Sequence, residues 1–444
     1  MKIRPTLKQL ATLFPVPLYV VGGAVRDCLL GVDGKDIDLA SSLTPDEVKK
    51  ALEGTQFRAL PTSPKLGTLK IKGGGEEYEY TSFRSDSYTG DGSHTPESVR
   101  FTDSIYEDAL RRDFTANAVY YDISEERFVD PLGGIKDIEN RILRAARDPY
   151  GVLREDGLRL LRMVRIACSC GFETEPALYS AAKKNASLLK NINNGRIGDE
   201  FAKILVCDTE NGVSGAHSRA VRMLIDFGLI NYILPELMEG DKFPQRADFH
   251  KYDVLEHTLK VFELSPPAVR IAALFHDISK PSQKLATGKM AGHEFAGAEV
   301  LRKKLSQLCF PKDVIERQAR LVECHMYDLK CETREQKLRL FIQKNYDIMD
   351  DLIDLKNADY EGSGMEGPNP SSKRMREVFE RMKAEGVPFT IKDLQVGGKE
   401  LIDLGIPENK RSAILKELLE SAANDKNLLS KQAQFEFLRS KTPI

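Results

Sequence analysis

The sequence predicts an α+β protein in which an N-terminal sheet domain precedes a long helical region. Up to about residue 145, short strand-like runs alternate with turn formers, at 17–23, 35–40, 66–72, 77–84 and 118–123. From Tyr150 onward, apolar residues recur at helical spacing and few strand candidates remain. We therefore expect a mixed or antiparallel sheet with flanking helices, followed by an all-α remainder.

Clusters of turn-forming residues divide the chain further. Gly73 to Gly75 separate two strand candidates and predict a hairpin. Apolar periodicity lapses near Pro149, at 211–214 and over 362–374. We therefore predict four domains, 1–148, 149–213, 214–361 and 362–444. The chain has 444 residues, 41% of them hydrophobic and 30% charged, which is enough for several cores.

Charge and cysteine content narrow the class of protein. The net charge is -2 and the isoelectric point is about 6.4, so any nucleic-acid surface must be a local basic patch. The seven cysteines are scattered and lack paired CxxC spacing, which favours reduced thiols over a zinc finger. No apolar run has the length of a membrane span, and the N-terminus lacks a signal-peptide pattern. We expect a cytoplasmic protein without membrane contact.

A glycine pair ends the first predicted strand. Gly22 and Gly23 lead directly into a predicted helix that carries Arg26. Such a turn leaves backbone N–H groups free to meet a phosphate, and the Arg26 guanidinium can bind the same anion. The alternative is that the glycine pair only forms the turn between strand and helix, because strand-Gly-Gly-helix connections are common.

Two aspartates in the run 35–40 are the strongest sign of chemistry. If Ile37 and the residues after it form a strand, alternation places Asp36 and Asp38 on one face, about 7 Å apart. Their mutual repulsion then favours divalent cations. Glu79, on a second predicted strand, supplies a third carboxylate, although Glu77 shares its face and strand register decides between them. We expect Glu79, and two cations serving phosphoryl transfer. The alternative is a group of solvated surface carboxylates.

The run RRDFTANAV at 111–119 combines basic, acidic and amide side chains with apolar anchors. We expect Arg112 to reach phosphate oxygens, and Asp113 and Asn117 to hydrogen-bond a ribose. Asp113 is also well placed to cap a helix by accepting backbone N–H groups, and both roles are compatible.

The run REDGLRLLRMVRIA at 154–167 predicts an amphipathic helix. Leu158, Leu161 and Val164 recur at core spacing, and Asp156 and Arg159 are then neighbours on the helix surface. A carboxylate accepts from the amino group of cytosine or adenine, and a guanidinium donates to the adjacent ring nitrogen. Uracil and guanine present the reverse pattern, at a cost of about 1–3 kcal/mol for each mismatched group. The alternative is a plain surface ion pair.

The motifs GGAVRD, DID, RRDFTANA and EDGLR, in this order and spacing, resemble the class II tRNA nucleotidyltransferases, or CCA-adding enzymes, whose sister group is the bacterial poly(A) polymerases. The resemblance implies a nucleotidyltransferase head, a neck, a body and a tail. It implies that Asp36 and Asp38 bind Mg²⁺ together with Glu79, and that Glu155 supports the base-reading pair. The implied nucleotide-binding residues are Gly22, Gly23, Arg26, Arg112, Asp113, Asn117, Asp156, Arg159 and Arg162.

Three further segments extend this resemblance. Residues 85–110 are similar to the flexible loop that the family uses to switch from C to A addition, which argues for full CCA addition and leaves A-only addition open. Residues 194–205 resemble the neck element, where Arg196 either supports the nucleotide pocket or follows a helix start capped by Asn194. Residues 393–420 resemble the tRNA-gripping tail, although PENK stands where many relatives have a glycine after the proline.

The helical region also resembles the HD phosphohydrolase signature. His257, the adjacent His276 and Asp277, and the later Asp359 would form a mixed nitrogen and oxygen shell for a divalent metal. His293 and His325 are placed for a second metal, and Lys280 for a phosphate. The alternative is a retained but inactive domain.

Together these motifs predict addition of C, C and A to the 3′ end of tRNA from CTP and ATP, with release of pyrophosphate and with Mg²⁺ in the head. Hydrolysis of RNA-end phosphates by the HD region is a possible second activity. Two alternatives remain: a poly(A) polymerase, and an HD phosphohydrolase whose head only binds RNA.

Overall fold

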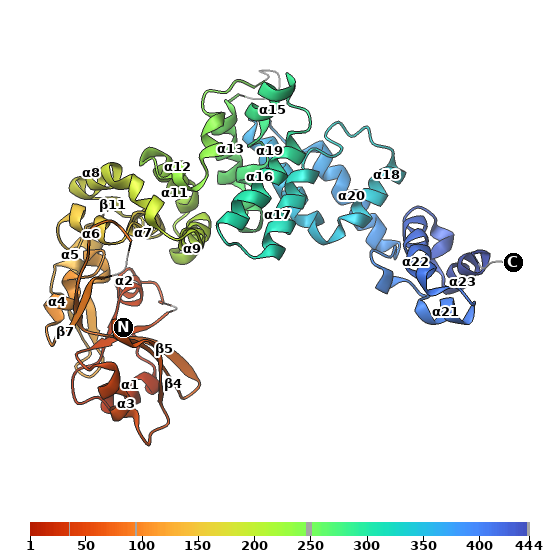
Figure 1. Ribbon diagram of the computed structural model, residues 1–444. Helices are drawn as coiled ribbons and strands as arrows, with labels where there is room; N and C mark the ends of the chain where they lie inside the picture. The colour runs from red at the N-terminus through yellow and green to blue at the C-terminus, as the bar shows by residue number, and fades with distance from the viewer. Residues whose placement is uncertain (35, 94–95, 246–250, 442–444) are drawn as a thin grey trace. The chain divides into compact units, whose positions relative to one another are not determined.

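The computed structural model describes residues 1–441 except 35, 94–95 and 246–250. The chain forms two compact units. Unit 1 comprises Met1–Pro235 and Gln307–Phe310, and unit 2 comprises Glu236–Ser306 and Pro311–Ile444. Figure 1 shows strands in the red and orange part of the chain and helices in the green and blue part, which confirms the expected α+β class.

Unit 1 is built on a seven-stranded mixed sheet with the order β3-β4-β5-β2-β1-β8-β9. The strands are β1 (Tyr19–Val21), β2 (Asp38–Ser41), β3 (Arg58–Ser63), β4 (Thr68–Gly73), β5 (Glu76–Ser82), β8 (Tyr120–Asp122) and β9 (Arg127–Val129). β2 and β5 run parallel, whereas the other neighbouring pairs are antiparallel. A separate hairpin pairs β6 (Arg84–Ser87) with β7 (Ser98–Phe101), and β10 (Ile142–Leu143) pairs with β11 (Glu173–Thr174).

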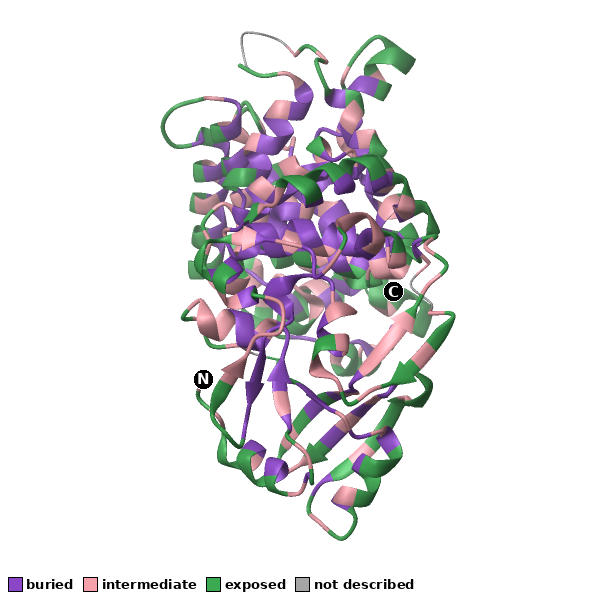
Figure 2. Cartoon of the chain, turned by 90° about the vertical axis from the view of Figure 1, so that its left-hand side faces the viewer, coloured by how far each residue is buried: buried purple, intermediate pink, exposed green. Residues whose placement is uncertain are grey.

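All five predicted strand runs contain strands of this sheet, and the predicted hairpin at Gly73 to Gly75 connects β4 to β5. The sheet core includes Val21, Ala40, Phe83 and Tyr120. In Figure 2, buried segments alternate with exposed ones along the strands, as expected for a sheet with one covered face.

Helices surround the sheet and continue beyond it in unit 1. They are α1 (Pro5–Thr12), α2 (Gly23–Leu29), α3 (Pro45–Leu52), α4 (Ile105–Leu110), α5 (Gly134–Glu139), α6 (Pro149–Glu155), α7 (Arg159–Ser169), α8 (Pro176–Asn185), α9 (Asn194–Leu205), α10 (Asp208–Asn211), α11 (Ala216–Asp226) and α12 (Ile230–Ile233). Leu161 and Val164 of α7 are fully buried, as their spacing predicted. A Cβ at Gly198 of α9 would lie 2.0 Å from the Leu308 carbonyl oxygen, so that close approach requires glycine.

Unit 2 is helical throughout its described residues. Its helices are α13 (Val254–Leu264), α14 (Arg270–Phe275), α15 (Lys280–Thr287), α16 (His293–Gln307), α17 (Lys312–Cys324), α18 (Glu335–Lys344), α19 (Met349–Gly362), α20 (Pro370–Ala384), α21 (Gly398–Asp403), α22 (Glu408–Ala422) and α23 (Lys431–Ser440). The last three enclose a small core that includes Leu401, Leu418 and Leu438.

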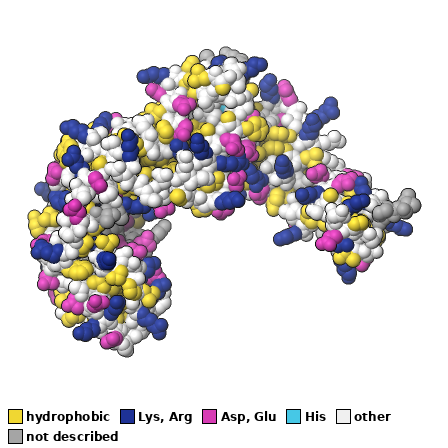
Figure 3. Space-filling model, viewed as in Figure 1, with side chains coloured by type: hydrophobic (Ala, Val, Ile, Leu, Met, Phe, Trp, Pro, Cys, Tyr) yellow, Lys and Arg dark blue, Asp and Glu magenta, His cyan; other side chains and the backbone are white. Residues whose placement is uncertain are grey.

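The surface is charged, and the helices do not resemble membrane spans. On the face shown in Figure 3, basic and acidic side chains are interspersed rather than segregated into one basic field. Among the described helices, none combines the length and the apolar character that crossing a bilayer requires.

Candidate active site and metal cluster

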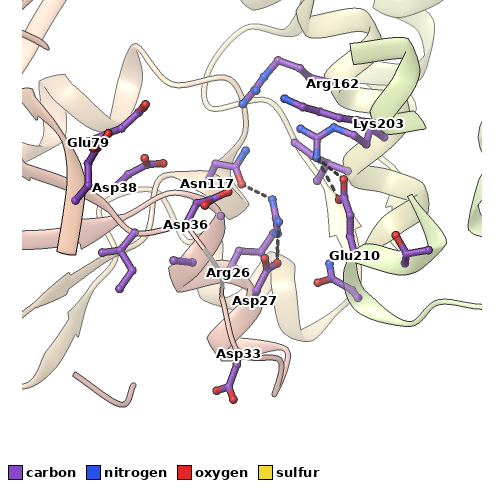
Figure 4. Close-up of a pocket in the computed structure, with 18 residues that line it drawn as sticks. Arg26, Asp27, Asp33, Asp36, Asp38, Glu79, Asn117, Arg162, Lys203 and Glu210 are labelled. Carbon is purple, nitrogen blue, oxygen red and sulfur yellow. Dashed lines mark hydrogen bonds and ion pairs between the residues drawn. The ribbon is translucent and has the colours of Figure 1, made fainter. Parts of the chain in front are cut away.

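The predicted metal-binding acids meet on the central strands of the sheet. β2 and β5 pair in parallel with Asp38 directly opposite Glu79, so both carboxylates leave the same face. β2 begins at Asp38, so Asp36 precedes the strand, although both aspartates were expected to lie in it. All three carboxylates nevertheless line one cavity, as Figure 4 shows.

The contacts of Glu77 and Glu79 differ although both line this cavity. The Nζ atoms of Lys70 and Lys72 each lie 2.5 Å from a Glu77 carboxylate oxygen, and these contacts lower the pKa of Glu77 to about 2. Glu79 makes no hydrogen bond or ion pair with the residues that the structure describes. Glu79 is therefore the carboxylate that is available to a metal ion.

The cavity has an acidic and a basic wall. It encloses about 840 Å³. Most acidic side chains come from the head and most basic ones from the neck helices α7 and α9, while Arg26 of α2 and Glu210 of α10 are exceptions. The charged lining residues are Arg26, Asp27, Asp33, Asp36, Asp38, Glu77, Glu79, Arg162, Arg165, Lys203 and Glu210. The arrangement suits a polyanionic ligand accompanied by cations.

Asp38, on the acidic wall, has a raised pKa. Water reaches it from the cavity, but protein surrounds its other sides. Burial raises the pKa of Asp38 to about 6; the Arg112 charge opposes this rise, and the neighbouring carboxylates of Glu79 and Asp36 add to it. A cluster that resists losing its protons in this way is suited to divalent cations, which would compensate the negative charge.

The glycine turn passes close to this cluster. Gly22 has a φ of 83°, and a Cβ added there would lie 3.2 Å from Oδ2 of Asp38. Arg26 lines the cavity but is buried, and its Nε and Nη1 donate to Asp27 and Asn117, each at 2.8 Å. Arg26 thus lines the cavity with its guanidinium held by internal acceptors, and its contact with a phosphate stays a prediction.

Arg112 is likewise held inside the head. Its Nη2 donates to Asp108 at 2.9 Å and its Nε to the Tyr120 hydroxyl at 3.0 Å. Arg112 is not among the cavity-lining residues. Its expected contact with phosphate oxygens stays a prediction, while the Arg112 charge acts on Asp38 through space.

Asp113 and Asn117, the expected ribose-binding pair, form one buried network. Asn117 donates to Asp113 at 3.0 Å, and Arg162 of α7 donates to the other carboxylate oxygen at 2.9 Å. Asp113 also accepts the backbone N–H of the adjacent Phe114 at 2.9 Å, but it does not cap a helix, since Phe114 precedes the next helical turn without a side-chain cap. The network connects the head to the neck and brings Arg162 to the cavity wall.

The predicted base-reading pair does not lie on one helix. α6 ends at Glu155 and α7 begins at Arg159, so Asp156 sits in the turn between them. Arg159 donates to Glu155 at 2.7 Å, whereas Asp156 accepts from Arg196 of α9 at 2.7 Å. The expected neighbouring arrangement on a helix surface was wrong, because the backbone breaks its helical path at Asp156. Asn193, rather than Asn194, caps α9.

Several cavity residues were not foreseen. Arg165, Lys203, Thr209, Glu210 and Asn211 complete the neck wall. Arg165 is paired with Glu200 and Glu210. Lys203 has no ion pair among the described residues. The helical spacing of Arg162 and Arg165, three apart on α7, was the available signal, but no motif pointed to α10.

The loop expected to govern the switch from C to A contacts this turn directly. Gly92 donates its N–H to the Arg154 carbonyl at 2.6 Å, and Gly157 donates its N–H to the Gly92 carbonyl at 3.0 Å. Ser93 and Asp156 form an isolated antiparallel bridge. His94 and Thr95 lie outside the described residues.

Unit 2 gathers the HD-signature residues into a buried cluster of two trios. The first trio is His257, His276 and Asp359, and the second is Asp277, His293 and His325. The prediction placed Asp277 with the first trio, and its Oδ2 lies 3.4 Å from His257 Nε2 and 3.3 Å from His276 Nε2. Asp277 also reaches the second trio, because its Oδ1 is 3.2 Å from His293 Nε2.

Backbone contacts fix three of the imidazoles for metal binding. The Nδ1–H groups of His276, His293 and His325 donate to carbonyl oxygens at 2.8, 2.9 and 2.6 Å. In the neutral ring this leaves Nε2 as the unprotonated atom, which is the form that binds a metal. The buried Nε2 of His325 has no hydrogen-bond partner among the described residues, whereas Nε2 of His293 lies 3.2 Å from Oδ1 of Asp277. Burial, reinforced by His276 and His293, lowers the pKa of His325 to about 3, which keeps the ring neutral.

Three family matches follow the chain in order. The Poly A polymerase head domain matches residues 18–144, the Probable RNA and SrmB-binding site of polymerase A matches 171–240, and the HD domain matches 251–359. Fold and site together therefore define a polymerase-type nucleotidyltransferase head followed by helical regions that include an HD domain.

Comparison with related sequences identifies the family within this class. A CC-adding tRNA nucleotidyltransferase of Thermus thermophilus is 31% identical over 366 residues, which cover 78% of this chain and 76% of the relative. The chain belongs to the class II tRNA nucleotidyltransferases, the family of the CCA-adding enzymes. A CCA-adding enzyme of a Geobacillus species is 37% identical over 238 residues, which cover 54% of this chain. That match spans about half the length of the relative, 55%.

The fold agrees with this assignment. The crystal structure of the Bacillus stearothermophilus CCA-adding enzyme in complex with CTP superposes with a TM-score of 0.65, at 24% identity. The superposition covers 99% of this chain and 98% of the other.

Proposed function

We propose that this protein adds C, C and A to the 3′ end of tRNA from CTP and ATP, without a nucleic-acid template, and releases pyrophosphate. The observation that carries the proposal is the in-register pairing of Asp38 with Glu79, beside Asp36, at a cavity whose opposite wall is basic. Family membership supports it, since relatives are named for this activity or for its CC-adding part.

The three carboxylates fit Mg²⁺, because oxygen ligands and concentrated negative charge favour that ion. Two such ions would lower the pKa of the tRNA 3′ hydroxyl and neutralise the departing pyrophosphate. The role of the chain is to position these groups: sheet register fixes the separation of Asp38 and Glu79, and Arg162 and Lys203 face them from the neck. Reaction then depends mainly on positioning and charge compensation.

Base choice is proposed to rest on Asp156 and Arg159. The Arg196 guanidinium orients the Asp156 carboxylate, and three acceptors hold Arg159: the carbonyl oxygens of Val152 and Arg111 and the Glu155 carboxylate. A guanidinium has five N–H donors, so Arg159 keeps donors for a ring nitrogen. Cytosine and adenine match this acceptor-and-donor pair, whereas uracil and guanine leave it mismatched.

One assay tests the proposal. Purified protein is incubated with Mg²⁺, tRNA that ends before its CCA, and each labelled nucleotide in turn and in combination. Growth by three residues that requires both CTP and ATP is expected. Growth by C residues alone would replace full CCA addition with CC addition. Growth only on tRNA already ending in CC would replace it with A addition. A long ladder from ATP alone would establish a poly(A) polymerase, and no growth would reject nucleotidyl transfer.

A second function is supported by the two trios of unit 2. We propose that together they would hold two divalent cations, with Asp277 within reach of both trios, and that this centre hydrolyses phosphate esters at RNA ends. The imidazole nitrogens and carboxylate oxygens of these six residues would suit Mn²⁺, Fe²⁺ or Ni²⁺, and such ions would supply an activated water as the nucleophile. Lys280, whose Nζ lies 2.6 Å from Asp277, is placed to orient a phosphate beside the centre.

Metal content distinguishes this proposal from an inactive domain. Two tightly bound transition-metal ions per chain are expected by elemental analysis, and Asp277→Asn is expected to lose both because Asp277 reaches both trios. Release of phosphate from an RNA 3′-phosphate, or opening of a 2′,3′-cyclic phosphate to a phosphomonoester, should follow the metal content. A protein that stays metal-free in excess Mn²⁺ would reject the second function.

A further inference from the structure

A lysine deep in unit 2 connects the two trios. Lys356 lies on α19 and is 1% exposed. A buried ammonium is costly unless it is fully hydrogen-bonded. Its Nζ donates to the backbone carbonyl oxygens of His325 and Tyr327, at 2.8 and 2.9 Å.

The acceptors of Lys356 belong to the turn that presents a ligand of the second trio. His325 follows directly after α17, where unsatisfied carbonyl groups and the helix dipole concentrate negative charge. An ammonium at this position satisfies the His325 carbonyl at the helix end and the Tyr327 carbonyl in the turn that follows. It thereby restricts the backbone from which the His325 imidazole projects.

Lys356 also belongs to the helix that presents a ligand of the first trio. Asp359 lies three residues later on α19, and residues three apart share one helix face. The Nδ2 of Asn369 donates to the Lys356 carbonyl at 2.7 Å, and Asn369 caps the next helix, α20. α19 is therefore anchored at the turn that carries both Lys356 and Asp359.

We propose that Lys356 is a positioning residue that fixes the His325 half of the centre relative to Asp359, and so permits the second metal ion to bind. This inference rests on the proposed two-metal function of unit 2. Among the described residues, the Lys356 ammonium donates no hydrogen bond to a ligand side chain, and it acts through the backbone of His325. Removing such an outer partner of a metal ligand typically costs about 10–100-fold in metal affinity.

The test is a Mn²⁺ titration of the full chain by calorimetry, with Asp36 and Asp38 both replaced by Asn so that the head contributes no ions. The parent is expected to bind two Mn²⁺. Lys356→Met is expected to keep one ion at parental affinity and to bind the other at least about tenfold more weakly. Lys356→Gln, which retains an N–H donor, should recover part of the loss. Lys303→Met, on the exposed face of α16, serves as the control and should match the parent.

The possible results distinguish the positioning role of Lys356 from the existence of the two-metal centre. Two ions bound equally well by the parent and by Lys356→Met would overturn the positioning role alone. Equal weakening of both ions in a variant that melts normally would also overturn it, because the effect would not be confined to His325. No Mn²⁺ bound by the parent would overturn the two-metal centre and this inference together. If Lys356→Met does not fold, Lys356→Gln decides by the same criteria.

Discussion

Replacing Asp38 by Asn should stabilise the metal-free head while abolishing its chemistry. Without metal ions, Asp38 shares the cavity with Asp36 and Glu79, and burial with this repulsion raises its pKa from 3.8 to about 6. A carboxyl group with a higher pKa in the folded state than in the unfolded state destabilises the fold wherever it is ionised. This cost is present in full above pH 6 and disappears as the pH falls from 6 towards 4. Asn carries no charge, so the variant avoids the cost.

The structure gives the size of the effect. The difference between 3.8 and 6 corresponds to about 3 kcal/mol, at about 1.4 kcal/mol per pH unit. Because water reaches Asp38 from the cavity, screening reduces the expected gain to about 1 kcal/mol. For a domain of 150–250 residues, that gain raises the melting temperature by about 2–4 °C.

The assay is thermal unfolding in EDTA at pH 7.5, 6.0 and 4.5. Asp38→Asn should melt above the parent at pH 7.5, and the difference should be clearly smaller at pH 4.5. Adding Mg²⁺ with a non-hydrolysable CTP analogue should stabilise the parent and not the variant. Asp33→Asn, at the same cavity, makes the same charge change and should leave the melting temperature unaltered. A variant that melts at or below the parent at pH 7.5 would refute the electrostatic reasoning.

Three further predictions concern neighbouring contacts. Glu79→Gln should reduce nucleotide addition by at least about a hundredfold, because the negative charge of a metal ligand is lost while its position is kept. Glu77→Gln should stay within about threefold of the parent. Equal losses in the two variants would show that Glu77 also binds metal. Arg196→Met should release Asp156 and raise UTP incorporation relative to CTP by about tenfold or more, with unchanged selectivity excluding the orienting role. Gly198→Ala should lower the free energy of unfolding by about 1–3 kcal/mol in denaturant titration, because its Cβ would collide with backbone; an unchanged midpoint would contradict the close packing of α9.

The sequence predicted the parts of the fold that depend on local pattern. Alternating apolar residues located the five strand runs, and helical spacing located the buried side of α7. The helix prediction failed at Asp156, where the apolar spacing of a helix continues in the sequence but the backbone leaves the helical conformation. Leu158 and Leu161 are spaced as in one helix, yet the helix restarts only at Arg159, because the Asp156 carboxylate accepts the Leu158 N–H at 3.0 Å and forms a turn.

The sequence predicted the placement of the acidic residues of the candidate site better than that of its basic residues. The positions of Asp38 and Glu79 followed from strand periodicity, and only pairing register was needed to bring them opposite one another. Arg26 and Arg112 were expected to face a ligand because basic residues beside an acidic motif suggest phosphate binding. Their partners, Asn117 for Arg26 and Asp108 for Arg112, come from other segments and become visible only when the chain is folded.

In unit 2, the sequence indicated the ligands but not their grouping. The adjacency of His276 and Asp277 suggested one shell. Consecutive residues at a helix end point in different directions, so Asp277 reaches between the trios while His276 stays in the first. Sequence spacing also gave no sign of Lys356, since its role depends on carbonyl groups from a turn about thirty residues earlier.

The most direct measurement of the central claim is anomalous diffraction from crystals soaked with Mn²⁺ and a non-hydrolysable CTP analogue. We predict two anomalous peaks in the cavity of unit 1, each within coordination distance of Asp36, Asp38 or Glu79, with the triphosphate between them and the neck wall. Peaks that lie away from these three carboxylates, or a nucleotide bound without any cation there, would contradict it.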